Sequence, residues 1–251
     1  MPGETKRVLI LGGTAEARQL AERAVAALPP DVEVITSFAG RTRRPQNPPG
    51  TIREGGFGGT QGLAAYLKSE QIDLVVDATH PFAEVMSEHA HDACLIAETR
   101  RVQLVRPAWR FPPGAKWLEV MDMDAAAEAV SRFARRAFLT TGTQEIDAFA
   151  QAPGVWFLVR LIEAPEDPLP LADHEVTLGR PPFSLEGETA LLDDHRIDTL
   201  VSKHSGGTRP AKIDAALAMA IPIVLIQPPP PPPGNHVESV EAALAWIEGQ
   251  L

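Results

Sequence analysis

Residues 8–23, VLILGGTAEARQLAER, constrain the fold of this 251-residue chain more than any other stretch. Residues 8–11 form a short apolar run, typical of a strand buried on both faces. Gly12 and Gly13 end that run, and Thr14 can cap the amphipathic helix that follows. Because the first backbone N–H groups of a helix lack partners and the helix dipole adds positive charge there, the turn predicts a phosphate or dinucleotide site. The full G-x-G-x-x-G fingerprint is absent, so a plain strand–helix connection is the alternative.

The same strand–turn–helix order returns along the chain. Apolar or β-branched runs are followed by turn residues and then by segments with helical spacing. We therefore expect an α/β protein made of two Rossmann-like parallel-sheet domains with the ligand cleft between them. The sequence Phe-Pro-Pro-Gly at 111–114 suggests the boundary, which gives domains 1–111 and 112–251. The expected elements include surface chain over 164–182, a stiff polyproline spur over 228–233 and a last helix over 236–249.

Composition excludes several classes of function. A net charge of −10 disfavours nucleic acid as a partner, and no apolar run approaches the ~20 residues that cross a bilayer. The single Cys94 fits a reducing compartment and rules out a cysteine metal cluster. His89 and His91 cannot share one helix face, so no metal site is expected. The start of the chain lacks a signal-peptide layout, and we expect a soluble, cytoplasmic protein.

The end of the second expected strand, residues 32–38, bears on the choice of cofactor. In a dinucleotide fold this point lies beside the adenosine ribose, where a carboxylate favours NAD and an arginine accommodates the 2′-phosphate of NADP. No carboxylate follows the strand, whereas Ser37, Arg41 and Arg43 offer a hydroxyl and two cations. The pattern favours NADP if a dinucleotide binds, although each arginine could equally be a solvated surface residue.

Polar residues follow further expected strands, at the sheet edge where open α/β sheets bind ligands. Asp77 lies near the end of the expected strand 72–78, and Thr79 and His80 follow that strand; Asp77 could cap the next turn, and His80 could carry a proton or be structural. Arg106 lies beside a proline and Trp109, a suitable lip for a flat anionic ligand. In the second half, the cations and turn residues at strand or helix ends are Thr141, Gly142, Lys203, Ser205 and Lys212. Taken by itself, Lys203 is better explained as an exposed loop lysine.

Four segments together resemble the precorrin-6A reductase family of cobalamin biosynthesis. They are ILGGTAEAR at 10–18, VVDATHPFA at 75–83 with RPAW at 106–109, FLTTG at 138–142, and SKHSGG at 202–207 with Lys212 downstream. They span most of the chain in family order. The family's final strand usually runs into an arginine–proline pair, but here it runs into Gln227 and six prolines.

The resemblance implies hydride transfer from NADPH to a double bond of a tetrapyrrole macrocycle, converting precorrin-6A to precorrin-6B. It implies a small-molecule substrate with carboxylate arms, and other enzymes of the cobalamin pathway as partners. Under this interpretation Gly12, Gly13, Thr14 and Ala15 hold the pyrophosphate; Ser37, Arg41 and Arg43 hold the 2′-phosphate; Asp77 and Thr79 flank the nicotinamide; His80 is the first candidate proton donor; and Arg106, Thr141, Gly142, Lys203, Ser205 and Lys212 receive the substrate.

Other functions remain open from the residues alone. A short-chain type of NADP-dependent reductase lacks support because Tyr66, the single tyrosine, has Glu70 rather than lysine four positions on. A nucleotide-sensing Rossmann module would bind cofactor without turnover. A transferase acting on phosphosugars or nucleotides would not bind a reduced nicotinamide.

Overall fold

The computed structural model describes residues 5–38 and 48–251. The chain divides into two compact units, Met1–Pro107 with Pro229–Leu251, and Ala108–Pro228. The expected division into 1–111 and 112–251 differs from these units mainly in residues 229–251, which return to the first unit. They return because β12 (Asn235–Val237) pairs with β5 (Arg100–Leu104), and α7 (Val240–Glu248) packs against the first core.

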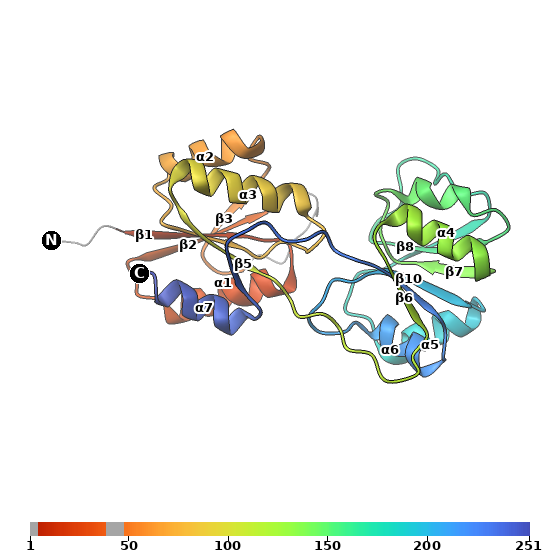
Figure 1. Cartoon of the computed structure of the whole chain (residues 1–251). Helices are drawn as coiled ribbons and strands as arrows, with labels where there is room; N and C mark the ends of the chain where they lie inside the picture. Colours follow the sequence, from red (N-terminus) through yellow and green to blue (C-terminus); the bar gives the residue numbers. More distant parts are fainter. Residues whose placement is uncertain (1–4, 39–47) are drawn as a thin grey trace. The chain divides into compact units, whose positions relative to one another are not determined.

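A fully parallel, six-stranded sheet forms the centre of the first unit, in the order β3-β2-β1-β4-β5-β12. Helices α1 and α7 cover one face of this sheet, and α2 and α3 cover the other (Figure 1). The elements not yet given bounds are β1 (Lys6–Leu11), α1 (Ala15–Ala27), β2 (Val32–Phe38), β3 (Thr51–Glu54), α2 (Gly59–Ser69), β4 (Leu74–Asp77) and α3 (Glu84–Ala97).

Strand β1 shows why the sheet is buried on both sides. Val8 and Ile10 join the core beneath α1 and α7, whereas Leu9 and Leu11 join the core beneath α2 and α3. All four side chains are at most 2% exposed. Alternating side chains along a strand point to opposite faces, so a continuous apolar run is what a two-sided strand requires.

The second unit repeats this layout, except that one edge strand comes from the start rather than the end of the strand sequence. Its fully parallel sheet has the order β9-β8-β7-β10-β11-β6, which matches the first sheet position by position. The last position of the second sheet is filled by β6, which precedes the other five strands of that sheet in sequence. In the first sheet the same position is filled by β12, which follows the other five strands. The elements are β6 (Trp117–Val120), α4 (Met123–Phe133), β7 (Arg136–Leu139), the 3₁₀ turn η1 (Ile146–Gln151), β8 (Trp156–Leu161), β9 (His174–Leu178), α5 (Leu185–Asp194), β10 (Thr199–Lys203), α6 (Ala211–Ala218) and β11 (Ile223–Ile226).

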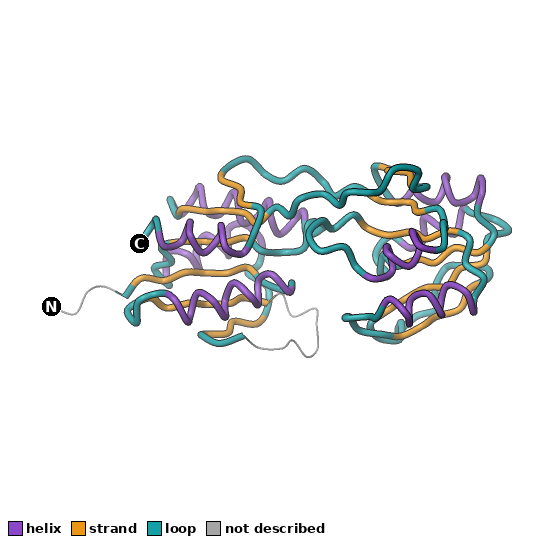
Figure 2. The backbone as a smooth tube through the Cα atoms, turned by 90° about the horizontal axis from the view of Figure 1, so that it is seen from below, coloured by secondary structure: helices purple, strands orange, loops and turns teal. Residues whose placement is uncertain are grey.

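Helices flank the strands of each unit on both sides (Figure 2). In the second unit, α5 and α6 cover the face that buries Phe138, Leu158 and Leu200. Parallel strands bury both faces when crossover helices cover them, which gives two Rossmann-like units. Among the described residues, no helix combines the length and the apolar character needed to span a membrane.

Three local expectations need correction. The polyproline segment 228–233 is a connection between the two units rather than a spur. The last helix begins at Val240 rather than at 236, because the Ser239 side chain caps it by accepting from the Ala242 N–H. The segment 164–182 contains β9, which pairs with β8.

Candidate active site

The turn between β1 and α1 is closed by three hydrogen bonds. The Gly12 N–H donates to the Ser37 carbonyl at 2.9 Å, and a Cβ on Gly12 would lie only 3.2–3.4 Å from atoms of the β2 end. Gly13 has a φ of +108°, which L side chains rarely adopt. Thr14 Oγ1 accepts from the Ala17 N–H at 3.1 Å and donates to the Ala78 carbonyl at 2.7 Å. The turn is thus packed against the ends of β2 and β4.

The turn lies where the strand order of the first sheet reverses. Strands β1 and β4 are neighbours, yet β1 leads to β2 on one side and β4 leads to β5 on the other. The Ala78 N–H donates to the Leu11 carbonyl at 3.1 Å, which joins the two strand ends. Open α/β sheets bind ligands at the carboxyl edge at such a reversal. The structure therefore brings together Gly12, Gly13, Thr14 and Ala15 with Asp77 and Thr79, as the sequence predicts.

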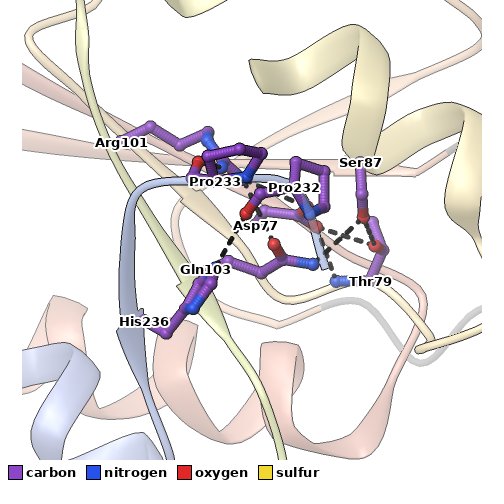
Figure 3. A network of polar contacts seen from close by, with 8 residues as sticks. All are labelled: Asp77, Thr79, Ser87, Arg101, Gln103, Pro232, Pro233 and His236. Carbon is purple, nitrogen blue, oxygen red and sulfur yellow. Dashed lines mark hydrogen bonds and ion pairs between the residues drawn. The ribbon is translucent and has the colours of Figure 1, made fainter. Parts of the chain in front are cut away.

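Asp77 lies inside a polar network at this edge (Figure 3). Its Oδ1 accepts from the Thr79 N–H at 3.2 Å and from the Thr79 hydroxyl at 2.7 Å, so it caps the turn after β4. Its buried Oδ2 accepts no hydrogen bond within the described chain and lies 3.8 Å from Arg101 Nη1. Thr79 Oγ1 also lies 3.3 Å from Ser87 Oγ, which accepts from the Gln103 amide. Asp77 therefore orients Thr79 rather than facing solvent.

The same network reaches the polyproline segment. Arg101 Nη2 donates to the Pro233 carbonyl at 3.0 Å, and His236 Nε2 lies 2.9 Å from the Pro232 carbonyl (Figure 3). The Arg101 side chain is only 6% exposed. The end of the polyproline connection is thereby fixed to the edge of the first sheet.

At the end of β2, Ser37 is buried and is held through its carbonyl by Gly12. Arg41 and Arg43, the two cations expected to follow it, lie outside the described residues.

His80 and Arg106 follow strands that end at the same edge, but they differ in solvent exposure. His80 is exposed, and its Nδ1 accepts from the Phe82 N–H at 3.3 Å, which leaves the ring proton of the neutral form on Nε2. Arg106 is largely buried, and its Nη2 lies 2.8 Å from Glu16 Oε2 in the first turn of α1. Burial lowers the pKa of Arg106, and Glu16 opposes this shift. Part of the Arg106 charge is therefore already balanced by Glu16.

The second sheet has its own reversal of strand order, between β7 and β10. Thr141 and Gly142 follow β7, and Lys203 and Ser205 lie at and after the end of β10, so all four share one edge. Thr141 Oγ1 is buried and has no hydrogen-bond partner among the described residues. Burial lowers the pKa of Lys203, with Glu145 opposing the shift. An unsatisfied buried hydroxyl beside a lysine suits an anionic, hydrogen-bonding ligand.

Lys212, in the first turn of α6, reaches this edge. Its Nζ donates to Thr140 Oγ1 at 2.7 Å, and the Thr140 hydroxyl donates to the Val201 carbonyl at 2.9 Å. Burial is the main cause that lowers the pKa of Lys212 to about 8; Arg160 lowers it further and Glu188 raises it. Arg160 and Glu188 form a buried pair through two hydrogen bonds of 2.5 and 3.0 Å.

Several residues of this edge carry no signal in the sequence that indicates a role. Thr140 binds Lys212, and the buried pair Arg160–Glu188 sets part of its electrostatic environment. His204 is buried: its Nε2 accepts from the Trp109 N–H at 3.0 Å, and its Nδ1 lies 3.2 Å from Glu119 Oε1. His204 and Thr140 stand in the motifs SKHSGG and FLTTG, but their partners are far away in sequence, so only the fold reveals them.

The two parallel sheets, each with a glycine-containing turn at its strand-order reversal, define the class of Rossmann-type α/β proteins. Within that class, the chain belongs to the family described as precorrin-6x reductase CbiJ/CobK, whose sequence profile matches residues 7–248. It is therefore an oxidoreductase, and a reductase family indicates a nicotinamide cofactor.

Individual relatives agree with this assignment. The chain is 46% identical to a precorrin-6A reductase of Rhodococcus erythropolis, with 96% of this chain and 97% of the relative covered. It is 29% identical to a cobalt-precorrin-6A reductase of Salmonella typhimurium, with coverage of 95% and 94%. A solved structure of CobK precorrin-6A reductase matches with a TM-score of 0.91 and 37% identity, over 98% of this chain and 97% of that one.

Proposed function

We propose that this protein uses NADPH to reduce one double bond of the precorrin-6A macrocycle, giving precorrin-6B. The observation that carries the proposal is the β1–α1 glycine turn at the strand-order reversal of the first sheet, in a member of a reductase family. NADPH, when bound, supplies the hydride, and the protein binds and orients the two ligands.

The first unit offers the groups that a dinucleotide needs. Gly12, Gly13, Thr14 and Ala15 hold the pyrophosphate, because the positive end of α1 and its first N–H groups lie at this turn. A larger residue in place of Gly12 would meet the β2 end, and Gly13 adopts its φ without strain. These features support cofactor binding at this edge of the sheet.

The remaining cofactor contacts follow the ends of β2 and β4. Ser37, Arg41 and Arg43 bind the 2′-phosphate. Thr79 contacts the nicotinamide amide, since its hydroxyl proton is given to Asp77 and its oxygen can still accept a hydrogen bond.

The second unit offers the groups that a macrocycle with carboxylate arms needs. Lys203 and Lys212 pair with carboxylates, while Thr141, Gly142 and Ser205 supply a hydroxyl or backbone donor. Arg106 in the first unit adds a further cation. The lowered pKa of Lys212 supports a ligand role, because a partly buried ammonium with a hydroxyl partner gains from an anion.

His80 is our candidate for delivering the proton that accompanies the hydride. Its Nε2–H is carried on an exposed ring beside the β4 end, and Nδ1 is fixed by the Phe82 N–H. A water molecule or a substrate carboxyl group is the alternative source.

We further propose that the substrate is the metal-free macrocycle. Identity is 38–46% to relatives named precorrin-6A reductase and 25–29% to relatives named cobalt-precorrin-6A reductase. The test supplies purified protein with NADPH or NADH and with metal-free or cobalt-bound precorrin-6A, and follows the absorbance of the reduced nicotinamide and of the macrocycle. We expect fastest turnover with NADPH and metal-free substrate. Cofactor binding without turnover on either macrocycle would contradict the proposal and favour a nucleotide-sensing module.

A further inference from the structure

We propose that Arg53, on β3, binds the 2′-phosphate of the cofactor and is a specificity-determining residue for NADPH over NADH. The inference rests on the proposed function, since it assigns a residue to the cofactor site given there. It adds a contact from a strand different from the one that carries Ser37.

Arg53 is placed by strand pairing beside Ser37. Strands β2 and β3 are parallel, and Ser37 is the register partner of Arg53, one position before each strand ends. Side chains at paired positions of neighbouring strands share one face of the sheet. Arg53 Nη1 lies 3.3 Å from Ser37 Oγ, so the guanidinium and the hydroxyl meet at the carboxyl edge.

Neutral groups hold the guanidinium in place. Nη1 donates to the Gly55 carbonyl at 2.6 Å, and Nη2 donates to the Gly56 carbonyl at 3.1 Å. The centre of the guanidinium lies 3.6 Å from the Phe57 ring centroid and 4.9 Å from that of Tyr66. This packing fixes the orientation of a long side chain before any ligand binds, which lowers the entropic cost of binding.

The charge of Arg53 has no carboxylate partner within the described ranges 5–38 and 48–251. Other arginines of the same unit are paired: Arg7 lies 3.0 Å from Glu33, and Arg106 lies 2.8 Å from Glu16. A partly buried cation that contacts two carbonyls, a hydroxyl and aromatic rings still attracts an anion, and guanidinium geometry matches a phosphate.

Ser37 connects this cation with the glycine turn. The Ser37 carbonyl accepts from the Gly12 N–H at 2.9 Å, while its hydroxyl contacts Arg53. An adenosine whose 5′-pyrophosphate lies at Gly12 and Gly13 would thus have its ribose beside the β2 end. The 2′-phosphate of NADPH is the anion that this geometry would bring to Arg53.

The alternative is that Arg53 is structural and only fastens the glycine-rich segment 55–59 through Phe57 and the two carbonyls. A structural role would affect NADPH and NADH alike, whereas 2′-phosphate recognition affects NADPH alone. The two roles therefore differ in a measurable ratio.

The test measures the dissociation constants of NADPH, NADH and adenosine 2′,5′-bisphosphate by isothermal titration calorimetry for the wild type, Arg53→Ala and Arg53→Lys. Arg100→Ala is the matched control: it removes the same charge from the same unit at the start of β5, where Arg100 Nη1 contacts Gln250. Loss of a charge-assisted contact predicts about 10- to 100-fold weaker NADPH and bisphosphate binding in Arg53→Ala, with NADH unchanged. The affinity of Arg53→Lys for NADPH should lie between those of the wild type and Arg53→Ala, because lysine keeps the charge but not the planar guanidinium.

The outcomes separate the two proposals. Unchanged NADPH affinity in Arg53→Ala, or equal weakening of NADPH and NADH, overturns the role of Arg53 while wild-type preference for NADPH still supports the cofactor site. A wild type that binds neither dinucleotide overturns the proposed function and this inference with it. If Arg100→Ala weakened NADPH binding as much as Arg53→Ala does, the role of Arg53 would also be refuted, because the effect would then come from the overall charge.

Discussion

We expect Lys212 to lower the stability of the second unit at neutral pH and the substitution Lys212→Met to raise it. The reason is that its pKa is lowered to about 8 from 10.5, chiefly by burial. A lysine whose pKa is lowered in the folded state binds its proton more tightly when unfolded, so the unfolded state is favoured at low pH. This cost is fully present below about pH 8 and disappears as the pH rises towards 10.5.

The size of the effect follows from the shift. One pKa unit corresponds to about 1.4 kcal/mol, so a shift from 10.5 to about 8 costs at most ~3 kcal/mol. The Lys212 side chain is only partly buried, and methionine loses the hydrogen bond to Thr140, so a gain of about 1–2 kcal/mol is the realistic value.

Urea unfolding of the wild type and of Lys212→Met at several pH values, from about neutral to about pH 10, measures both the gain and its pH dependence. Lys116→Met is the control, because Lys116 is an exposed lysine of the same unit. We expect the gain in Lys212→Met to shrink as the pH rises and Lys116→Met to be neutral. A Lys212→Met variant less stable than wild type at neutral pH, or a gain independent of pH, would refute the reasoning. The same variant should bind substrate more weakly, as expected for a residue kept for its ligand.

Three further variants test other parts of the molecule. The double variant Arg41→Ala with Arg43→Ala should narrow the ratio of NADPH to NADH affinity by about tenfold, measured by cofactor titration; an unchanged ratio removes these two residues from the 2′-phosphate site. Lys203→Ala should raise the substrate KM about tenfold with little change in cofactor affinity, and steady-state kinetics that showed an effect on cofactor alone would contradict the assignment. Glu188→Ala should lower the free energy of unfolding by about 3–5 kcal/mol, because Arg160 would be left buried without its partner; a loss below about 1 kcal/mol in denaturant unfolding would argue against that account.

The central strands could be predicted from sequence, whereas three edge strands could not. β2 begins and ends at the expected residues, and β1 and β4 differ from their expected bounds by one or a few residues. Runs such as VLIL and IVLI bury almost every side chain, so their composition alone indicates a strand. β3, β9 and β12 are short, partly exposed and rich in polar residues, and they pair only because a neighbour offers its free edge.

Most of the candidate site could be predicted from the positions of the strand ends. The rest depends on contacts between residues far apart in the sequence. The turn at Gly12 and the turn at Asp77 could be brought together from the rule for parallel sheets. The pairing of Arg106 with Glu16, the contact of Lys212 with Thr140 and the position of Arg53 beside Ser37 depend on side chains 16 to 90 residues apart. Such contacts leave no local pattern in the sequence. The return of the C-terminal segment to the first unit was missed for the same reason.

Isotopic labelling follows the hydride that we propose passes from NADPH to the macrocycle. NADPH carrying deuterium at the C4 position of the nicotinamide is incubated with precorrin-6A and the protein, once for each of the two C4 stereoisomers, and the corrinoid product is analysed by mass spectrometry and NMR. We expect one stereoisomer to deliver deuterium to a single carbon of the product and the other to deliver none. A reduced product free of deuterium with both stereoisomers, or oxidation of NADPH without a reduced macrocycle, would contradict this hydride transfer.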